Sequence, residues 1–201
     1  MDTLEKINKP KLDLACGDNK REGFFGIDVV KTESVDYVFD LQQFPWPIES
    51  ESVEEINCSH YIEHIPHDNT KAILKESNNF EEFKDKMIAS KDGAIEFFNE
   101  LYRILKPGGK VKLIAPYYSS IRAWGDPTHT RAICDLSFYY LDKKWMDDNK
   151  LSHYGLNCDF EVSLSYFINN ELTLKSDEVR TNMIKHSLNT VEDIIVELIK
   201  K

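Results

Sequence analysis

The stretch FFNELYRILKPGGKVKLIAP, residues 97–116, holds a helix signal, a stop signal and a strand signal in direct succession. Its apolar side chains recur at the spacing of one helix face, beginning a turn upstream, at Ala94, Phe97, Phe98, Leu101, Ile104 and Leu105. Lys106 falls in the last turn, and Pro107-Gly108-Gly109 ends the helix. The apolar run from Lys110 to Ala115 then predicts a strand, joined to the helix by a tight turn.

Short apolar runs on either side extend this pattern. Upstream, four of them predict strands at residues 11–16, 24–30, 35–40 and 54–59. Downstream, residues 160–167 and 171–175 predict a β-hairpin that turns at Asn169-Asn170. Thr190 to Asp193 reads as a capping box before the amphipathic stretch IIVELIKK, so a helix is expected at the end of the chain. Strands that alternate with helices predict an α/β fold with a mostly parallel sheet and an antiparallel C-terminal hairpin.

The 201 residues fit a single domain, 1–201, with two additions. The polar, charge-rich segment 68–92 predicts a helical insertion, either a solvated decoration or a lid over a ligand. Residues 176–201 are expected to form a C-terminal helical tail. The apolar positions of its last helix, Val191, Ile194, Ile195 and Leu198, are expected to pack on the sheet or in a dimer interface. The chain is therefore expected to be a monomer or a homodimer.

The net charge of the chain bears on which classes of partner it can bind. It carries 25 basic and 35 acidic side chains, a net charge of −10. Residues 1–66 alone hold 6 basic and 14 acidic side chains. A field of this sign repels a phosphate backbone, so nucleic acid is disfavoured as a partner.

The expected cellular compartment rests on the apolar runs, the N-terminal stretch and the cysteines. No apolar run is long enough to span a bilayer, and the charged N-terminal stretch MDTLEKINKP has no apolar signal segment. The four cysteines are far apart and lack the spacing of a zinc site. We expect a cytoplasmic protein with reduced thiols and no membrane partner.

A glycine turn and two acids point to a nucleoside site. The strand Leu12-Asp13-Leu14 runs into the turn 15–18, which contains Gly17, and the next strand ends at Asp28. This order recurs where a nucleoside lies on the carboxyl ends of a parallel sheet. A small residue lets the backbone approach the ligand, and a carboxylate one strand away can accept hydrogen bonds from both ribose hydroxyls. Asp40, at the end of the third strand, could reach an adenine edge.

Five stretches in this order resemble the class I S-adenosylmethionine-dependent methyltransferases, particularly the branch often labelled type 11. They are LDLACG, GFFGIDVV, DYVFDLQQFPWP, SVEEINCSHYIEHIP and FFNELYRILKPGGKVKLIAP, which together cover roughly residues 11–116. The resemblance implies a Rossmann-like seven-stranded sheet and a transferase that binds S-adenosyl-L-methionine and releases S-adenosyl-L-homocysteine. The implied cofactor-binding residues are Asp13, Ala15, Cys16, Gly17, Asp28, Val29, Asp40, Leu41 and Ser59.

Within that set the resemblance also implies roles. Residues 15–17 would face the methionine part, Asp28 the ribose, Asp40 and Leu41 the adenine, and Ser59-His60 the floor near the methyl group.

Two departures from the family pattern concern the first turn. Asn19 stands where the family usually has a second glycine; asparagine also tolerates a positive φ but approaches a ligand less closely. Only eleven positions separate Gly17 from Asp28, too few for a full crossover helix. We therefore expect the first crossover helix to be shortened or absent and this side of the cofactor site to be open. The same shortness argues against an NAD dehydrogenase.

Residues 60–64 spell H-x-x-E-H, an inverted zinc-protease motif. On a helix His60 and His64 would share a face, and a metal-dependent hydrolase would use that pair. Pro66 shortens any such helix, and the sequence offers no obvious third ligand. A similar string is common in the resembled branch, so we expect no metal site and place His60 near the cofactor.

The loop 116–131, PYYSSIRAWGDPTHTR, follows the strand 110–115 and is the expected substrate wall. Its candidate substrate residues are Tyr117, Tyr118, Arg122, Trp124 and Arg131, with Arg131 as an anion clamp. His129 is the candidate general base, so the candidate catalytic residues are His129 and His60. The alternative interpretation is an ordered loop that Asp126 and Pro127 turn and whose aromatic side chains fill its own core.

The function expected from these features is methylation of a small molecule or polar metabolite by direct transfer from S-adenosylmethionine. Methyl transfer from a sulfonium is favourable, so alignment of methyl group and acceptor can suffice without a base. Two alternatives remain: a non-catalytic module that binds or senses S-adenosylmethionine, and the hydrolase that uses His60 and His64.

Overall fold

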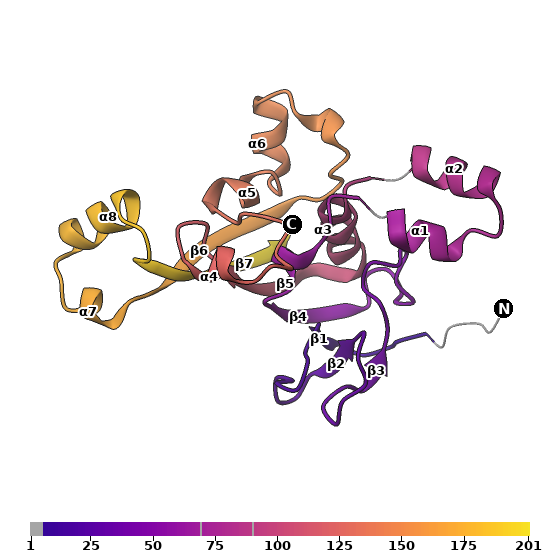
Figure 1. The fold of residues 1–201 in the computed structure, drawn as a ribbon, viewed down its shortest axis with the longest axis horizontal. Helices are drawn as coiled ribbons and strands as arrows, with labels where there is room; N and C mark the ends of the chain where they lie inside the picture. The colour runs from indigo at the N-terminus through magenta and orange to yellow at the C-terminus, as the bar shows by residue number, and fades with distance from the viewer. Residues whose placement is uncertain (1–5, 69, 90) are drawn as a thin grey trace.

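Seven strands form one mixed sheet in a computed structural model that describes residues 6–68, 70–89 and 91–201. The strands lie in the order β3-β2-β1-β4-β5-β7-β6 (Figure 1). They are β1 Lys11–Leu14, β2 Phe25–Asp28, β3 Tyr37–Val38, β4 Val53–Ser59, β5 Leu105–Pro116, β6 Phe160–Ile168 and β7 Val191–Lys200. The first five pair in parallel, and β7 is antiparallel to both β5 and β6. The predicted fold class is confirmed.

The connection between β1 and β2 contains turns and no helix, as the short spacing predicts. Hydrogen bonds replace the missing helix: Asp36 accepts one from the Gly26 amide at 2.7 Å and one from Lys20 Nζ at 2.7 Å. Figure 1 shows β1, β2 and β3 at one edge of the molecule, joined by loops. No helix lies in the connection between β1 and β2, and the turn that contains Gly17 lies at this edge of the sheet.

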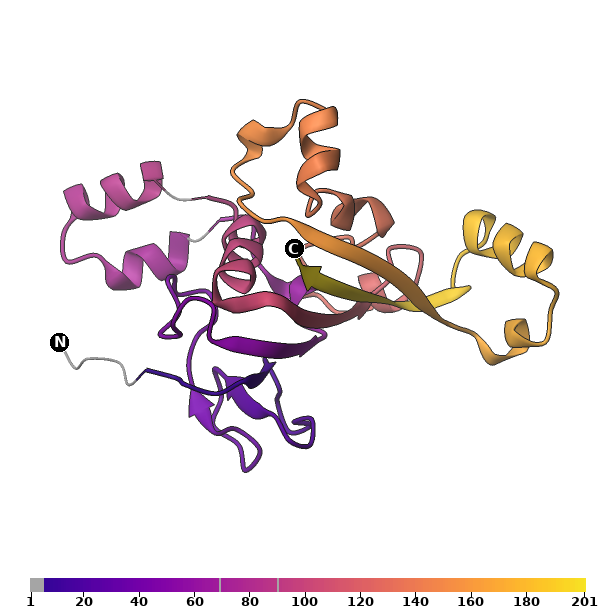
Figure 2. The same ribbon diagram turned by 180° about the vertical axis from the view of Figure 1, so that it is seen from behind.

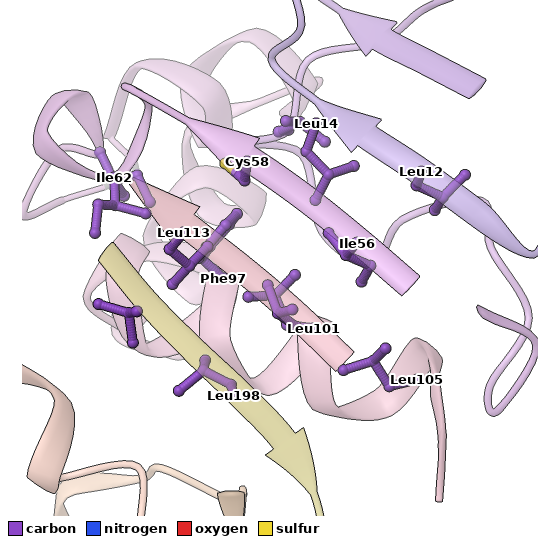
Figure 3. Close-up of a cluster of buried hydrophobic side chains, with 14 of the residues drawn as sticks. Leu12, Leu14, Ile56, Cys58, Ile62, Phe97, Leu101, Leu105, Leu113 and Leu198 are labelled. Atoms are coloured by element: carbon purple, nitrogen blue, oxygen red, sulfur yellow. The ribbon is translucent and has the colours of Figure 1, made fainter. Parts of the chain in front are cut away.

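The helix predicted at the centre of the sequence is α3, Gly93–Ile104. It begins at Asp92, whose carboxylate accepts a hydrogen bond from the Ala94 amide at 2.8 Å. Its apolar face is fully buried: Phe97, Leu101 and Ile104 have no exposed surface. Figure 3 shows Phe97 and Leu101 among side chains of β1, β4 and β5. The main core therefore lies between α3 and the middle of the sheet.

The opposite face of the sheet carries a row of polar side chains across β4, β5, β7 and β6. The register places Asn57 beside Lys112, Lys112 beside Glu197, and Glu197 beside Ser163. All four side chains are half-buried or exposed. The alternation of apolar and polar residues along these strands matches a sheet that is packed on one face and solvated on the other.

The end of the chain corrects one expectation. Residues 191–200 form strand β7 rather than a helix. Val191, Ile194, Ile195 and Leu198 do recur at helical spacing, but Ile194, Val196, Leu198 and Lys200 also alternate inward. Half of the ten residues are β-branched, which favours a strand between β5 and β6. Of the expected C-terminal helical tail 176–201, only the first part is helical, as α8, Asp177–His186.

The predicted hairpin has a different second strand. β6 pairs with β7, not with residues 171–175. Asn169 caps the short helix α7, Asn170–Thr173, by accepting a hydrogen bond from the Glu171 amide at 3.0 Å. Helices α7 and α8 therefore form the connection from β6 to β7, and they project from one end of the molecule (Figures 1 and 2).

The segment 68–92 contains two helices, α1 Thr70–Glu76 and α2 Phe80–Ala89, which extend away from the sheet (Figure 1). Shorter helices follow the strands: η1 Ile62–His64, α4 Arg122–Gly125, α5 Asp135–Tyr139, α6 Lys143–Asp148 and η2 Ser152–Tyr154. Among the described residues, no helix has both the length and the apolar character that a bilayer crossing requires. Residues 1–5, part of the charged N-terminal stretch, lie outside the described residues, as do 69 and 90.

Candidate functional site

The turn after β1 has an unusual backbone. Ala15 and Gly17 both have left-handed conformations, with φ of 53° and 52°. A Cβ atom added at Gly17 would meet no other atom within 4 Å, so the space beside this residue is open. The strand order reverses at β1: β2 and β3 lie on one side of it, and β4 and β5 lie on the other. In open α/β sheets ligands bind at such a point, beyond the carboxyl ends of the strands.

Asp28, the last residue of β2, faces the same turn. Its Oδ2 accepts a hydrogen bond from the Gly17 amide and its Oδ1 accepts one from the Val30 amide, both at 3.0 Å. An ionised carboxylate has about four lone-pair positions, so each oxygen keeps one for a further donor. Asp28 therefore fixes the glycine turn and still offers both oxygens to a ligand.

Two predicted cofactor residues pack the base of the turn. Asp13 is buried, and its carboxylate accepts hydrogen bonds from the Asn57 side chain at 2.7 Å and from the Arg21 amide at 2.6 Å. Cys16 is buried as well, and burial, with the charges of Asp13 and Asp28, raises the pKa of its thiol to about 11. A thiol held in this protonated form is no nucleophile. Both side chains support the turn from below.

The other predicted cofactor residues line the same edge in different ways. Val29, directly after Asp28, is 60% exposed. Asp40 turns the chain after β3 by accepting the Gln42 amide at 3.0 Å. Leu41 has a buried side chain, and its carbonyl accepts the Trp46 indole N–H at 3.0 Å. Ser59 is half-buried at the end of β4.

His60 lies between two buried carboxylates. It follows β4 with φ of 55°, and its amide extends the ladder by donating to the Ile114 carbonyl at 2.8 Å. Its Nδ1 lies 3.4 Å from Glu63 Oε1, and its Nε2 lies 4.0 Å from Asp193 Oδ2. The Glu63 carboxylate, and to a lesser degree Asp193, raises the pKa of the imidazole above its ordinary value, although burial opposes the shift. A side chain 39% exposed at this position can take up a proton from a neighbouring ligand.

A cleft of about 560 Å³ opens beside His60. It is bounded by the residues after β4 and by the loop after β5: His60, Glu63, His64, Pro116, Arg122, Gly125, Asp126, Pro127 and His129. Arg122 donates from its guanidinium to Asp193 at 2.8 Å, and burial raises the pKa of the Asp193 carboxyl despite that cation. The volume fits a ligand of metabolite size.

The structure separates the predicted substrate residues. Arg122 lines the cleft, whereas the Tyr117 ring is buried and its hydroxyl donates to Asp135 at 3.3 Å. Tyr118 is 42% exposed and borders a different hollow, next to Cys134. Trp124 is 68% exposed and donates from its indole N–H to the Tyr118 carbonyl at 2.8 Å.

Arg131 and His129 have different environments. The Arg131 guanidinium donates to the Ile65 and Pro66 carbonyls and to both oxygens of Asp92, all within 2.9 Å. Its charge is thus compensated inside the protein. His129 is 9% exposed at the cleft, and its Nδ1 lies 3.0 Å from the Ala123 carbonyl.

Two residues of the site were not predicted, Glu63 and Asp193. Glu63 belongs to the H-x-x-E-H string, in which the motif assigns the ligand role to the two histidines. Asp193 was assigned to a helix start, whereas the structure pairs it with Pro116 at the cleft end of β5. A strand interpretation of residues 191–200 would have placed this carboxylate at the site.

Comparison with known proteins gives matches only at the level of structure. No family model matches the sequence, and no curated protein does. The structure is similar to that of an S-adenosylmethionine-dependent methyltransferase from Archaeoglobus fulgidus, with a TM-score of 0.58 and 16% identity over 94% of this chain and 85% of that one. A further match is an S-adenosylmethionine-dependent methyltransferase from Mesorhizobium loti, with a TM-score of 0.46 and 12% identity over 94% and 90%.

A third match is phosphoethanolamine N-methyltransferase 2 from Haemonchus contortus in complex with S-adenosyl-L-methionine. It has a TM-score of 0.46 and 14% identity over 98% of this chain, which spans only 49% of that protein. The strand order and the match to the Archaeoglobus structure together define the fold class. The fold is the Rossmann-like fold of the class I S-adenosylmethionine-dependent methyltransferases.

Proposed function

We propose that the protein transfers the methyl group of S-adenosylmethionine to a small polar molecule bound in the cleft beside His60. The observation that carries this proposal is the position of two half-sites at one edge of the sheet. An open glycine turn tied to Asp28 and a cleft that contains a carboxylate-flanked imidazole lie at the same carboxyl edge of the sheet.

The residues around the turn fit the cofactor. The free lone pairs of Asp28 suit the two ribose hydroxyls, and the open space at Gly17 lets the methionine part approach the backbone. Exposed Val29 offers an apolar surface to the adenine ring, and Asp40 lies one strand further along. When bound, S-adenosylmethionine supplies an electrophilic methyl group on a sulfonium.

His60 is the residue best placed to accept the proton of the acceptor. Its ring is open to the cleft, and the carboxylates of Glu63 and Asp193 stabilise the imidazolium that forms. A base that is positioned in this way contributes about 10²–10⁴-fold to a proton transfer. His129 is the second candidate, with a more buried ring and with Nδ1 engaged by a carbonyl.

The cleft also bears on the two alternatives. A sensor would bind cofactor with its acceptor cleft filled by the segment 68–92, yet the residues that bound the cleft come from 60–64 and 116–129. A hydrolase would need His60 and His64 on one ion. The structure instead groups His64 with Glu63 and His129. No observation favours either alternative over methyl transfer.

Calorimetric titration of the full chain with S-adenosylmethionine and S-adenosylhomocysteine tests the cofactor. We expect binding of both, and Asp28→Ala should weaken it at least about 10-fold, because hydrogen bonds to a charged group contribute about 1.5–3 kcal/mol. Glu22→Ala is the matched control, since it removes an exposed carboxylate from the same connection. Neither heat nor a thermal shift with either ligand would overturn the proposal.

The acceptor class needs a separate experiment. The wild-type protein and labelled S-adenosylmethionine are incubated with pools of metabolites, nucleic acids and proteins. Label recovered in the metabolite fraction supports a small-molecule acceptor, and label confined to nucleic acid or protein contradicts it.

A further inference from the structure

Three potential metal ligands converge on one wall of the cleft. Glu63 and His64 are consecutive residues of η1, and His129 comes from the loop after α4. One ligand atom from each side chain lies within 4.8 Å of the others. The two imidazole rings contact each other edge to face, with centroids 4.6 Å apart. The fold therefore joins two parts of the sequence that no local motif links.

The Glu63 carboxylate is the independent sign of a ligand. Its side chain is 2% exposed, and neither oxygen accepts a hydrogen bond from any residue within 6–68, 70–89 or 91–201. A buried carboxylate without hydrogen bonds is costly, because burial removes the water that would otherwise solvate its charge. A bound cation would supply the missing partner.

The outer hydrogen bonds prepare both imidazoles for metal binding. His129 Nδ1 lies 3.0 Å from the Ala123 carbonyl and donates to it, which leaves Nε2, 3.9 Å from Asp126 Oδ2, as the atom that would bind a metal. His64 Nδ1 lies 3.0 Å from Thr128 Oγ1, and that hydroxyl donates its own hydrogen to Asp126 at 2.6 Å. The hydroxyl must then accept from His64 Nδ1, and His64 Nε2 has no hydrogen-bond partner among the described residues. Such second contacts fix the tautomer of metal-binding histidines.

We propose that Glu63, His64 and His129 bind a divalent first-row transition-metal ion of the Zn²⁺ type. Two neutral imidazoles and one carboxylate form a donor set that zinc uses in catalytic sites, where a fourth position stays open. Mg²⁺ and Ca²⁺ prefer sets made of oxygen ligands, so they should bind poorly here. The open position lies in the cleft that all three residues bound.

A metal-free explanation competes with this proposal. His60 Nδ1 lies 3.4 Å from Glu63 Oε1, and a protonated His60 would compensate the buried charge. That explanation gives no role to the edge-to-face pair of His64 and His129 or to the hydrogen bonds of the Thr128 hydroxyl. The two accounts differ in whether the histidines bind an ion stoichiometrically.

The open position would take an oxygen ligand. If the cleft holds the methyl acceptor, as the proposed function has it, an acceptor with a hydroxyl or carboxylate oxygen would bind the ion there. The ion would orient such an oxygen toward the methyl group, and a bound hydroxyl would release its proton to water as its oxygen attacks the methyl carbon. The carbon–sulfur bond breaks as the carbon–oxygen bond forms, and its electron pair stays on sulfur.

Metal titration of the full chain, without an affinity tag and after dialysis against a chelator, tests the site. We expect one Co²⁺ per chain, with the visible absorption of a four- or five-coordinate ion, and displacement of Co²⁺ by Zn²⁺ but not by Mg²⁺. His64→Ala and His129→Ala should each weaken binding at least about 100-fold, and Glu63→Gln should do the same while keeping the side-chain volume. His186→Ala, an exposed histidine of α8, is the matched control.

Thr128→Val is the most discriminating variant, because it keeps the shape of the side chain, leaves all three ligands in place and removes the hydroxyl that joins His64 to Asp126. It should weaken Co²⁺ binding about 10–100-fold. Circular dichroism of each variant separates loss of the site from loss of the fold. Binding that none of these substitutions alters, an absorption band of a cobalt–thiolate bond, or no stoichiometric binding would overturn the proposal. Because this readout involves no cofactor, its outcome is independent of the calorimetry with S-adenosylmethionine.

Discussion

His60, Ala15 and Gly17 share a left-handed backbone at the carboxyl edge of the sheet. For a residue with a side chain this conformation costs about 1–2 kcal/mol. At His60 the hydrogen bond from its amide to the Ile114 carbonyl holds the backbone in place, and the ring lies between Glu63 and Asp193. Strain of this kind gathers where a side chain must be presented to a ligand. These residues therefore mark the site independently of any comparison.

Gly26 is the residue at which close packing is most demanding. A Cβ there would lie 2.8 Å from Cys16 Sγ and 2.9 Å from the Ser34 carbonyl oxygen, and that backbone atom cannot move aside easily. We expect Gly26→Ala to lower the free energy of unfolding by about 1–3 kcal/mol in urea titrations. Gly125→Ala is the control, since a Cβ there meets nothing within 4 Å. Equal stability of the two variants would contradict this account.

Asp36 should make stability depend on pH. The Lys20 ammonium and the Gly26 amide, both hydrogen-bonded to it, hold the pKa of this carboxyl below its ordinary value. The stabilisation is therefore complete above the unfolded pKa, about 4, and is lost as pH falls through the lower folded pKa. With the side chain 34% exposed, solvent screening limits the effect of Asp36→Asn to about 1 kcal/mol at pH 7.

The measurement for Asp36 is urea unfolding of wild type and variant at several pH values between 7 and about 3. The difference in stability should shrink as the pH drops below about 4. A difference that stays constant over this range would show that the carboxylate charge is not what matters.

At the scale of elements, local patterns predicted what local forces decide. The α3 helix was predicted nearly to its ends, because its apolar stripe lies within one stretch. The strand after it was predicted to begin at Lys110, whereas β5 begins at Leu105, so Lys106 is not helical and Pro107-Gly108-Gly109 belong to the strand and not to a turn. β7 was predicted wrongly because its apolar residues satisfy both periods. What selects the strand is the pair of neighbours β5 and β6, and these contacts are not visible in the segment itself.

The same distinction applies to the site. The glycine turn and Asp28 lie close together in the sequence, so their meeting could be predicted. The meeting of His60 with Asp193 depends on β7 lying beside β5, and the meeting of His64 with His129 depends on the loop after α4. Both required knowledge of how distant strands pair.

Helices α1 and α2 should be dispensable for stability. None of their described residues belongs to the main core cluster, although Ile73 is buried. Replacing residues 70–89 by a flexible Gly-Ser linker should therefore shift the melting temperature by less than about 3 °C, the equivalent of about 1 kcal/mol at this chain length. A much larger drop would mean that this segment is part of the folded unit. Methyl transfer that falls while the melting temperature holds would support a role as a lid.

Across the whole molecule, the sheet divides the two halves of the proposed reaction. β1, β2 and β3 carry the glycine turn and Asp28, while the cleft is built from residues after β4 and β5, with Asp193 from β7. Much of the acidic excess lies in residues 1–66, where Asp13, Asp28 and Asp36 accept hydrogen bonds from backbone amides around the glycine turn. The net charge of −10 therefore says little about the charge of the ligand that the cleft binds.

This division predicts that binding and turnover can be separated by single substitutions. His60→Gln should lower the rate of methyl transfer about 10²–10⁴-fold while the Kd for S-adenosylmethionine stays within about twofold, because His60 faces the acceptor. Asp28→Ala should raise that Kd and leave the KM for the acceptor unchanged. Calorimetry supplies the Kd, and transfer of labelled methyl to the acceptor found in the pools supplies the rate. If His60→Gln weakened cofactor binding as much as turnover, the ring would belong to the cofactor half, and the proton would have to leave by another residue.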